Sequence, residues 1–180
     1  MFLKALVVTV CLIKLASTQS SDPDPCNSFN ITDTIGQMKL MLRSSCINGK
    51  NFVLWTTQTA SWFRADNICR FNQMQLAMIN SAEEQTLVSN LIDRSTFGNN
   101  GFWTSGNDLA CQRNWYWSSN GSPIKYFSWK AGEPNNLRNT NERCINLMSK
   151  VDNYQWNDAP CDHPYYFICE EKCGCDKTKF

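Results

Sequence analysis

The sequence carries almost no net charge and contains a single histidine. Lys and Arg number 17 against 16 Asp and Glu over 180 residues, which gives a formal net charge of +1. Because there is neither a basic stripe nor an acidic tail, nucleic acids and anionic membrane surfaces are poor candidates as partners. His163 has no second imidazole to share a metal, and the single C-x-C pair has no counterpart at zinc-finger spacing. A zinc site is therefore not expected, and we place His163 at the surface.

Signatures of hydrolytic enzymes are also missing. Neither Gly-x-Ser-x-Gly nor His-Glu-x-x-His occurs in the chain, although each marks a large class of catalytic sites. The adjacent Asp162 and His163 have no evident nucleophile to activate. We therefore expect no enzymatic activity.

No apolar run reaches the roughly 20 residues that a membrane-spanning helix needs. The longest run, from Ala5 to Ile13, follows Lys4 and precedes small and polar residues at positions 16–20. This order is typical of a secretory signal peptide. We predict that residues 1–20 are a cleaved signal, and that the mature protein is secreted, extracellular and without a membrane span.

Cysteine, in contrast, is abundant. The chain has ten, of which one lies in the predicted signal, so nine remain. In an oxidising compartment most of them should pair. Nine is an odd number, which leaves a free thiol or a disulfide-linked dimer open. The sequence allows Cys46 to pair with Cys26 or Cys111, and it places Cys173 and Cys175 in an exposed tail, residues 172–180, that is suited to linking chains.

Two N-x-S/T sequons, at Asn30 and Asn120, predict glycosylation of a secreted protein. Pro123 follows the second sequon, so we expect that site to be used less often.

The apolar pattern predicts two helices followed by short strands, within one domain of residues 46–171. A first helix, capped by Thr59 or Ser61, runs to about residue 71. Ser81 and Glu84 form a capping box that opens a second helix ending near Arg94. The strand-like segments are 51–55, 76–79, 101–103, 114–117, 124–129, 143–148 and 165–169. This arrangement indicates an α+β fold.

A lead segment, residues 21–45, precedes this domain. Its first residues are rich in Ser, Asp and Pro and are not expected to fold. Ile35, Met38, Met41 and Leu42 follow at helical spacing and predict a short amphipathic helix. The helix could pack on the domain or pair with another chain.

Oxygen-bearing side chains gather in and after a polar stretch between residues 130 and 141. They are three carboxylates and two amides: Glu133, Asn135, Glu142, Asn157 and Asp158. Calcium takes six to eight oxygen ligands from irregular loops, whereas zinc and copper favour His and Cys, which are absent from this set. The same residue types are also common in any solvated loop, so composition alone leaves both interpretations open.

A series of motifs then follows a fixed order over residues 51–170. They are Cys69, Leu76-Ala77-Met78-Ile79, Phe102-Trp103-Thr104-Ser105-Gly106, Glu133-Pro134-Asn135, Glu142-Arg143-Cys144, Trp156-Asn157-Asp158, Cys161 and Phe167-Ile168-Cys169-Glu170. Together they resemble a C-type lectin domain of the mannose type. The Trp-Thr-Ser-Gly variant and the short chain are similar to small secreted arthropod lectins. The resemblance implies a C-type lectin-like fold, in which two helices join antiparallel sheets and a long calcium-binding loop.

The resemblance also implies roles for individual residues. Pro134 would follow a cis peptide bond, and disulfides would join Cys69 to Cys169 and Cys144 to Cys161. The second disulfide would fasten a loop that carries Asn157 and Asp158. The residues implied to hold one Ca²⁺ and, through it, a sugar are Glu133, Asn135, Glu142, Asn157 and Asp158.

The implied ligands are glycans with equatorial vicinal hydroxyls, namely mannose, fucose or N-acetylglucosamine, and the implied role is innate immune recognition. Asn136 and Arg143 stand where relatives with an accessory calcium site have acids, so one ion is expected rather than two. The alternative is a module of the same fold that binds a protein partner and keeps only a vestigial sugar site.

Overall fold

The computed structural model describes residues 41–137 and 140–173. The predicted signal peptide, the Asn30 sequon, Cys26 and Cys175 lie outside these ranges, as does most of the lead segment. Within the described ranges, no helix combines the length and apolarity needed to cross a bilayer.

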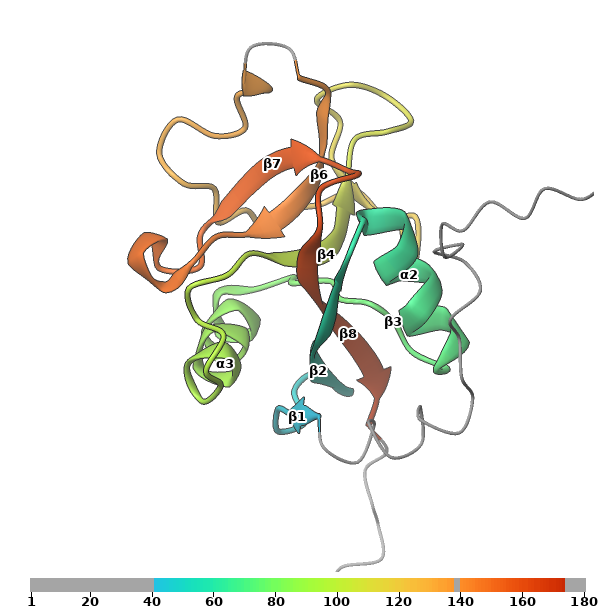
Figure 1. Cartoon of the computed structure of the whole chain (residues 1–180). Helices are drawn as coiled ribbons and strands as arrows, with labels where there is room; N and C mark the ends of the chain where they lie inside the picture. The colour runs from blue at the N-terminus through green and yellow to red at the C-terminus, as the bar shows by residue number, and fades with distance from the viewer. Residues whose placement is uncertain (1–40, 138–139, 174–180) are drawn as a thin grey trace, which may run out of the picture.

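The sheet is mixed, with mostly antiparallel pairing, and is flanked by two α-helices in the described part of the chain (Figure 1). The strands follow the order β1-β2-β8-β4-β6-β7, with β3 paired to β8 and β5 to β4. Among the strands of the described residues, β4 and β8 are the one parallel pair. This architecture confirms the predicted α+β class. The elements are β1 (Leu42–Arg43), β2 (Lys50–Ala60), α2 (Trp62–Phe71), β3 (Gln75–Leu76), α3 (Ala82–Asp93), β4 (Phe102–Asn107), β5 (Tyr116–Trp117), β6 (Glu142–Leu147), the 3-10 helix η2 (Lys150–Asp152), β7 (Trp156–Pro160) and β8 (Tyr165–Lys172).

Both predicted helices are present, and serines cap their N-termini. Ser61 Oγ accepts a hydrogen bond from the N–H of Arg64 at 3.3 Å, which selects Ser61 over Thr59 as the cap of α2. Ser81 Oγ accepts from the N–H of Glu84 at 3.2 Å at the start of α3. The Glu84 carboxylate accepts from the N–H of Asn80 at 2.8 Å, one residue earlier than a standard capping box would have it.

Several local predictions were wrong. Residues 124–129 form no strand, because their backbone meets β7 only where Trp129 bridges Trp156. Their apolar side chains are explained by aromatic packing on the Trp156 ring rather than by a strand ladder. The strand expected at 76–79 is limited to β3, and Leu42, assigned to a helix, lies in β1.

The sheet separates two apolar clusters. One lies under α3 and contains Val88, Leu91 and Trp156, all fully buried. The other lies under α2 and contains Trp103 and the half-cystine Cys69. Three buried tryptophan N–H groups have acceptors: those of Trp103, Trp62 and Trp156 donate to Ala60 O, Thr104 O and Gln85 Oε1 respectively. The N–H of Trp55, which is 2% exposed, has no hydrogen-bond partner among the described residues, so the core satisfies the polar part of most but not all of these side chains.

Three disulfides fasten the described residues. Cys69–Cys169 and Cys144–Cys161 are formed, as the resemblance implies. The third joins Cys46 to Cys173, so neither pairing of Cys46 that the sequence left open, with Cys26 or with Cys111, is formed, and Cys173 is not available to link chains. Cys111 is exposed and unpaired.

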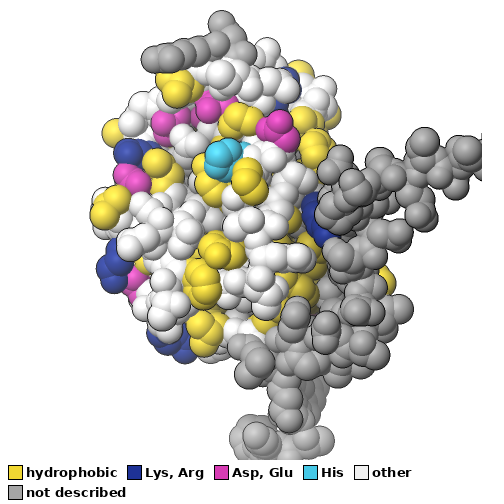
Figure 2. Space-filling model, in the orientation of Figure 1, with side chains coloured by type: hydrophobic (Ala, Val, Ile, Leu, Met, Phe, Trp, Pro, Cys, Tyr) yellow, Lys and Arg dark blue, Asp and Glu magenta, His cyan; other side chains and the backbone are white. Residues whose placement is uncertain are grey.

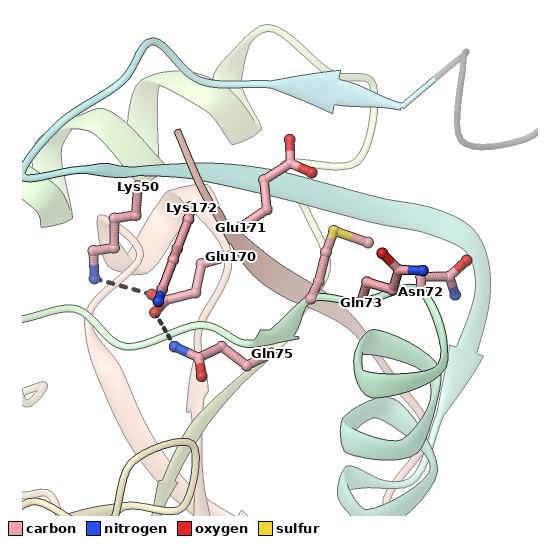
Figure 3. Close-up of a pocket in the computed structure, with 8 residues that line it drawn as sticks. Lys50, Asn72, Gln73, Gln75, Glu170, Glu171 and Lys172 are labelled. Carbon is pink, nitrogen blue, oxygen red and sulfur yellow. Dashed lines mark hydrogen bonds and ion pairs between the residues drawn. The ribbon is translucent and has the colours of Figure 1, made fainter. Parts of the chain in front are cut away.

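A buried ion cluster closes the end of the sheet that lies near β1. Lys50 Nζ is 3.0 Å from a Glu84 oxygen and 2.9 Å from a Glu170 oxygen, and all three side chains are nearly buried. Figure 3 shows the Lys50 and Gln75 side chains both directed at Glu170. Gln75 Nε2 donates a hydrogen bond to Oε1 of Glu170 at 2.7 Å. A buried charge that lost its partners would be costly, so this cluster fixes how β2, α3 and β8 meet.

Candidate functional site

The long loop between β5 and β6 lies at the opposite end of the molecule, at the top of Figure 1. The peptide bond between Glu133 and Pro134 is cis, as the resemblance implies. The N–H of Glu133 donates to the carbonyl of Lys130 at 2.9 Å, which forms a turn before the cis bond. The loop therefore reaches the predicted site in a defined backbone conformation.

Asp158 lies at the centre of the predicted set. It sits on β7, rather than on the loop expected from the sequence, and is 2% exposed. Its carboxylate accepts hydrogen bonds from the backbone N–H groups of Asn135 at 3.0 Å and Asn136 at 2.8 Å. Hydrogen bonds to an ionised acceptor are stronger than neutral ones, so Asp158 holds the long loop against the sheet.

Asn157, also on β7, is positioned by a residue that sequence reasoning missed. Its Nδ2 donates to Oδ1 of Asn146 at 3.2 Å and to the backbone oxygen of Asp158. Asn146 faces Asn157 in the β6–β7 register and is 3% exposed. Both bonds use the amide nitrogen, so the amide oxygen of Asn157 is the atom left to act as a ligand. The available signal for Asn146 was a polar residue between the apolar Ile145 and Leu147 of β6.

Glu142 is the first residue of β6 and closes the loop. Its N–H donates to Oδ1 of Asn136 at 2.9 Å, and its carboxylate accepts from the N–H of Leu137. Burial raises the pKa of Glu142 above its ordinary value, and the charge of Asp158 adds to this effect. Asn136, which has a left-handed φ of 43°, thus donates to the Asp158 carboxylate and accepts from the Glu142 backbone, so it joins the two ends of the site.

Glu133 carries the clearest electrostatic signal. Its Oε2 is buried and has no hydrogen-bond partner among the described residues. The pKa of Glu133 is raised to about 7, chiefly by burial, with contributions from contact with the Asp158 carboxylate and from the charges of Asp158 and Glu142. Neighbouring acids repel one another, and among the described residues no positive charge offsets the rise in the pKa of Glu133 or Glu142.

This donor set fits calcium in its chemistry. It offers only oxygen ligands, and the three carboxylates would balance the charge of a divalent cation with one charge to spare. The unpartnered Glu133 oxygen and the raised pKa values of two acids mark a place where a cation would lower the energy. In the ranges that the structure covers, no three His, Cys, Asp or Glu side chains already stand grouped as a metal site. Part of the oxygen set is instead engaged by backbone N–H groups.

A second pair of charges lies beside this set. Arg143 Nε is 2.5 Å from a carboxylate oxygen of Asp108, which is itself 2% exposed, and the guanidinium also donates to the Asp108 backbone oxygen. The other Asp108 oxygen accepts from the N–H of Arg113 at 2.6 Å. The positive group expected at Arg143 is therefore present, and its partner Asp108, which sequence reasoning did not single out, ties the loop after β4 to β6.

Acidic side chains are also visible on the surface at this end of the molecule. Figure 2 shows acidic side chains gathered near the upper edge of the molecule, the end that carries the long loop. His163 lies at the surface, as predicted, and its ring centroid is 4.4 Å from that of Tyr165.

Comparison with known proteins identifies the domain. Residues 58–171 match the family model described as "Lectin C-type domain". The chain is 30% identical to "C-type lectin mosGCTL-7" of Culex quinquefasciatus over 62% of this chain and 69% of the relative. It is 36% identical to "C-type lectin mannose-binding isoform" of Oxyuranus scutellatus over 61% and 70% respectively.

Solved structures give the same fold. The carbohydrate-recognition domain of a mouse scavenger receptor C-type lectin superposes with a TM-score of 0.63 at 28% identity, covering 73% of this chain and 96% of that one. A type II antifreeze protein of herring superposes equally well, with a TM-score of 0.63 at 27% identity, covering 73% and 97%. The fold is thus shared by proteins with different ligands, so the ligand must be argued from the site.

Proposed function

The chain belongs to the C-type lectin domain family, and on this premise we propose that it is a secreted lectin that binds mannose-, fucose- or N-acetylglucosamine-type glycans through a calcium ion. Domains of this family bind carbohydrates and are not enzymes, which agrees with the absence of catalytic motifs. The residues proposed to hold both the ion and the sugar are Glu133, Asn135, Glu142, Asn157 and Asp158.

The observation that carries the proposal is the buried, unpartnered oxygen of Glu133 beside Asp158. A carboxylate oxygen without a donor is costly unless a cation or a proton satisfies it. Sequence alone offered five scattered oxygen donors, whereas the structure supports a common location for them. The backbone N–H bonds to Asp158 and the turn before the cis bond bring the long loop to β7.

The arrangement suits a pair of neighbouring sugar hydroxyls. When bound, calcium supplies open coordination positions for two hydroxyl oxygens. The carboxylates of Glu133 and Glu142 would each accept a hydrogen bond from one hydroxyl, and the Asn135 amide would donate to one of the same oxygens. The Asn157 amide could donate to the other only by giving up one of its bonds to Asn146 or to the Asp158 backbone. The order of acid and amide around Pro134 sets which hydroxyl geometry fits. Because these bonds replace bonds to water, a single site should be weak, and useful binding requires several sites.

Affinity chromatography tests this function directly. We expect the full chain to be retained on immobilised mannose in millimolar calcium and released by a chelator. The variant Glu133→Ala should bind calcium about tenfold more weakly or worse, since loss of groups around a metal costs that much. Asp162→Ala removes an exposed acid near the disulfide Cys144–Cys161 and serves as the matched control.

Two outcomes would redirect the proposal. Failure of the intact chain to bind mannose, fucose or N-acetylglucosamine in calcium would favour the protein-binding alternative. Retention that survives the chelator would show that the sugar does not bind through the ion.

Secretion, glycosylation and a role in innate immune recognition complete the proposal. The oxidised cysteines support an extracytoplasmic location, since three disulfides form in the described residues. Asn120 is exposed in a turn where its side chain accepts from the N–H of Ser122, so it is open to modification. Peptide mass spectrometry before and after glycosidase treatment would test use of this sequon.

A further inference from the structure

The proposed calcium site opens into a pocket whose lining extends beyond the five proposed ligands. The pocket measures about 410 Å³ and lies between the long loop and the loop after β4. Pro134, Asn135, Glu142 and Asp158 form one side of it. A volume of this size falls in the range of small-molecule sites, roughly 300–1,000 Å³, and exceeds what two hydroxyls on an ion require.

The other side of the pocket is aromatic. It is formed by Trp115, Phe127 and Trp129. The rings of Phe127 and Trp129 are stacked, with centroids 6.2 Å apart and planes 17° apart, and Trp115 meets Trp129 edge to face at 5.0 Å. Phe127 is 44% exposed, which leaves a large apolar ring face open to water at the mouth of a polar site.

The aromatic wall is held in place by the sheet. The N–H of Trp156 on β7 donates to the carbonyl of Ser128 at 2.7 Å, and the N–H of Lys130 donates to the carbonyl of Trp156 at 2.9 Å. These two bonds bracket Trp129 and fix it next to the strand that carries Asn157 and Asp158. The wall is therefore preorganised relative to the proposed ligands, which lowers the entropy cost of binding against it.

We propose that this wall is a subsite for the second residue of a glycan whose terminal residue occupies the proposed calcium site. A pyranose ring has one or more faces made of C–H groups and a polar edge of hydroxyls, so it can lie against aromatic rings while its hydroxyls face polar groups such as Gln112 at the pocket rim. The subsite rests on the proposed function, because it uses that site to place the terminal residue. It makes the preferred ligand an oligosaccharide rather than a single sugar.

Calorimetric titration of the full chain in calcium tests the subsite. The ligands are methyl α-mannoside and the α1,2-, α1,3- and α1,6-linked mannobioses. We expect at least one mannobiose to bind about three- to tenfold more tightly than the monosaccharide, the gain typical of one aromatic contact. The variant Phe127→Ala should lose that gain and keep the monosaccharide affinity, and Phe127→Trp should retain the gain. Phe63→Ala, at a phenylalanine 52% exposed on α2 and outside the pocket, should change neither affinity.

The outcomes separate the subsite from the proposed function. If the monosaccharide binds but no mannobiose binds more tightly, or if Phe127→Ala weakens both ligands equally, the subsite is wrong and the lectin function stands. If the monosaccharide fails to bind while a mannobiose binds in the presence of chelator and is lost in Phe127→Ala, the wall binds sugar and the calcium function is wrong. If none of the four ligands binds, and fucose and N-acetylglucosamine also fail to bind in calcium, both proposals are wrong.

Discussion

Removal of the Cys46–Cys173 disulfide offers a quantitative test of how the termini of the domain are held. The bridge spans 127 residues, and a loop of that length closed in an otherwise open chain would stabilise the fold by about 5 kcal/mol. However, Cys69–Cys169 already closes 100 of those residues. With the Cys69–Cys169 bridge intact, removal of Cys46–Cys173 opens an effective loop of only 27 residues in the unfolded chain, the difference between 127 and 100. The same relation then gives about 3.5 kcal/mol.

The double variant Cys46→Ser/Cys173→Ser should therefore lose about 3.5 kcal/mol in denaturant unfolding, or roughly 7–14 °C in melting temperature for a domain of this size. In a background that lacks Cys69–Cys169, the same change should cost about 1.4 kcal/mol more. The exposed Cys111→Ser is the matched control and should leave stability unchanged. Equal costs in the two backgrounds, or a loss below about 1 kcal/mol in the first, would refute the nested-loop reasoning.

Three further outcomes are expected. The pKa of Glu133 in the metal-free protein is raised to about 7, so calcium must displace a proton from this carboxyl at lower pH. The affinity for calcium should therefore fall about tenfold per pH unit below 7. Calcium titrations that give a constant affinity from pH 8 to 5.5 would contradict this. Lys50→Met strands two buried carboxylates and should cost roughly 3–5 kcal/mol in unfolding experiments; a near-neutral effect would show that these acids become protonated at little cost. Glu133→Gln with Asn135→Asp should shift preference from mannose to galactose in competition assays, and unchanged selectivity would show that this loop does not set specificity.

Much of the fold could be predicted because its signals are local. Ser61 and Ser81 cap helices in the way that their sequence contexts indicate, and the two disulfides implied by the family resemblance are formed. The pairing of Cys46 with Cys173 could not be predicted, since nothing local relates residues 127 positions apart. The prediction of a strand at 124–129 was wrong, because apolar content alone does not distinguish strand pairing from the packing of aromatic rings on a neighbouring strand.

For the proposed site, the sequence supplied the residue types but not the contacts between them. The acids and amides were proposed as ligands from residue type and from the family resemblance, and the cis bond before Pro134, implied by the resemblance, is present. The hydrogen bonds from the long loop to Asp158, and the support of Asn157 by Asn146, depend on the β6–β7 register. The pairing of Arg143 with Asp108 joins segments 35 residues apart. Such contacts follow from tertiary structure, so sequence pattern could not reveal them.

The position of β8 in the sheet has a consequence for how the protein is made. This strand lies between β2 and β4 and also pairs with β3, so every part of the sheet near α2 depends on it. Its partner β2 is synthesised more than a hundred residues earlier and must wait, with its apolar residues uncovered, until residues 165–172 emerge. Assembly of long-range pairs of this kind is slow and prone to aggregation. Folding should therefore begin with the helices and be completed only after β8 is released, and the disulfide Cys69–Cys169 can form only then, because Cys169 lies in β8.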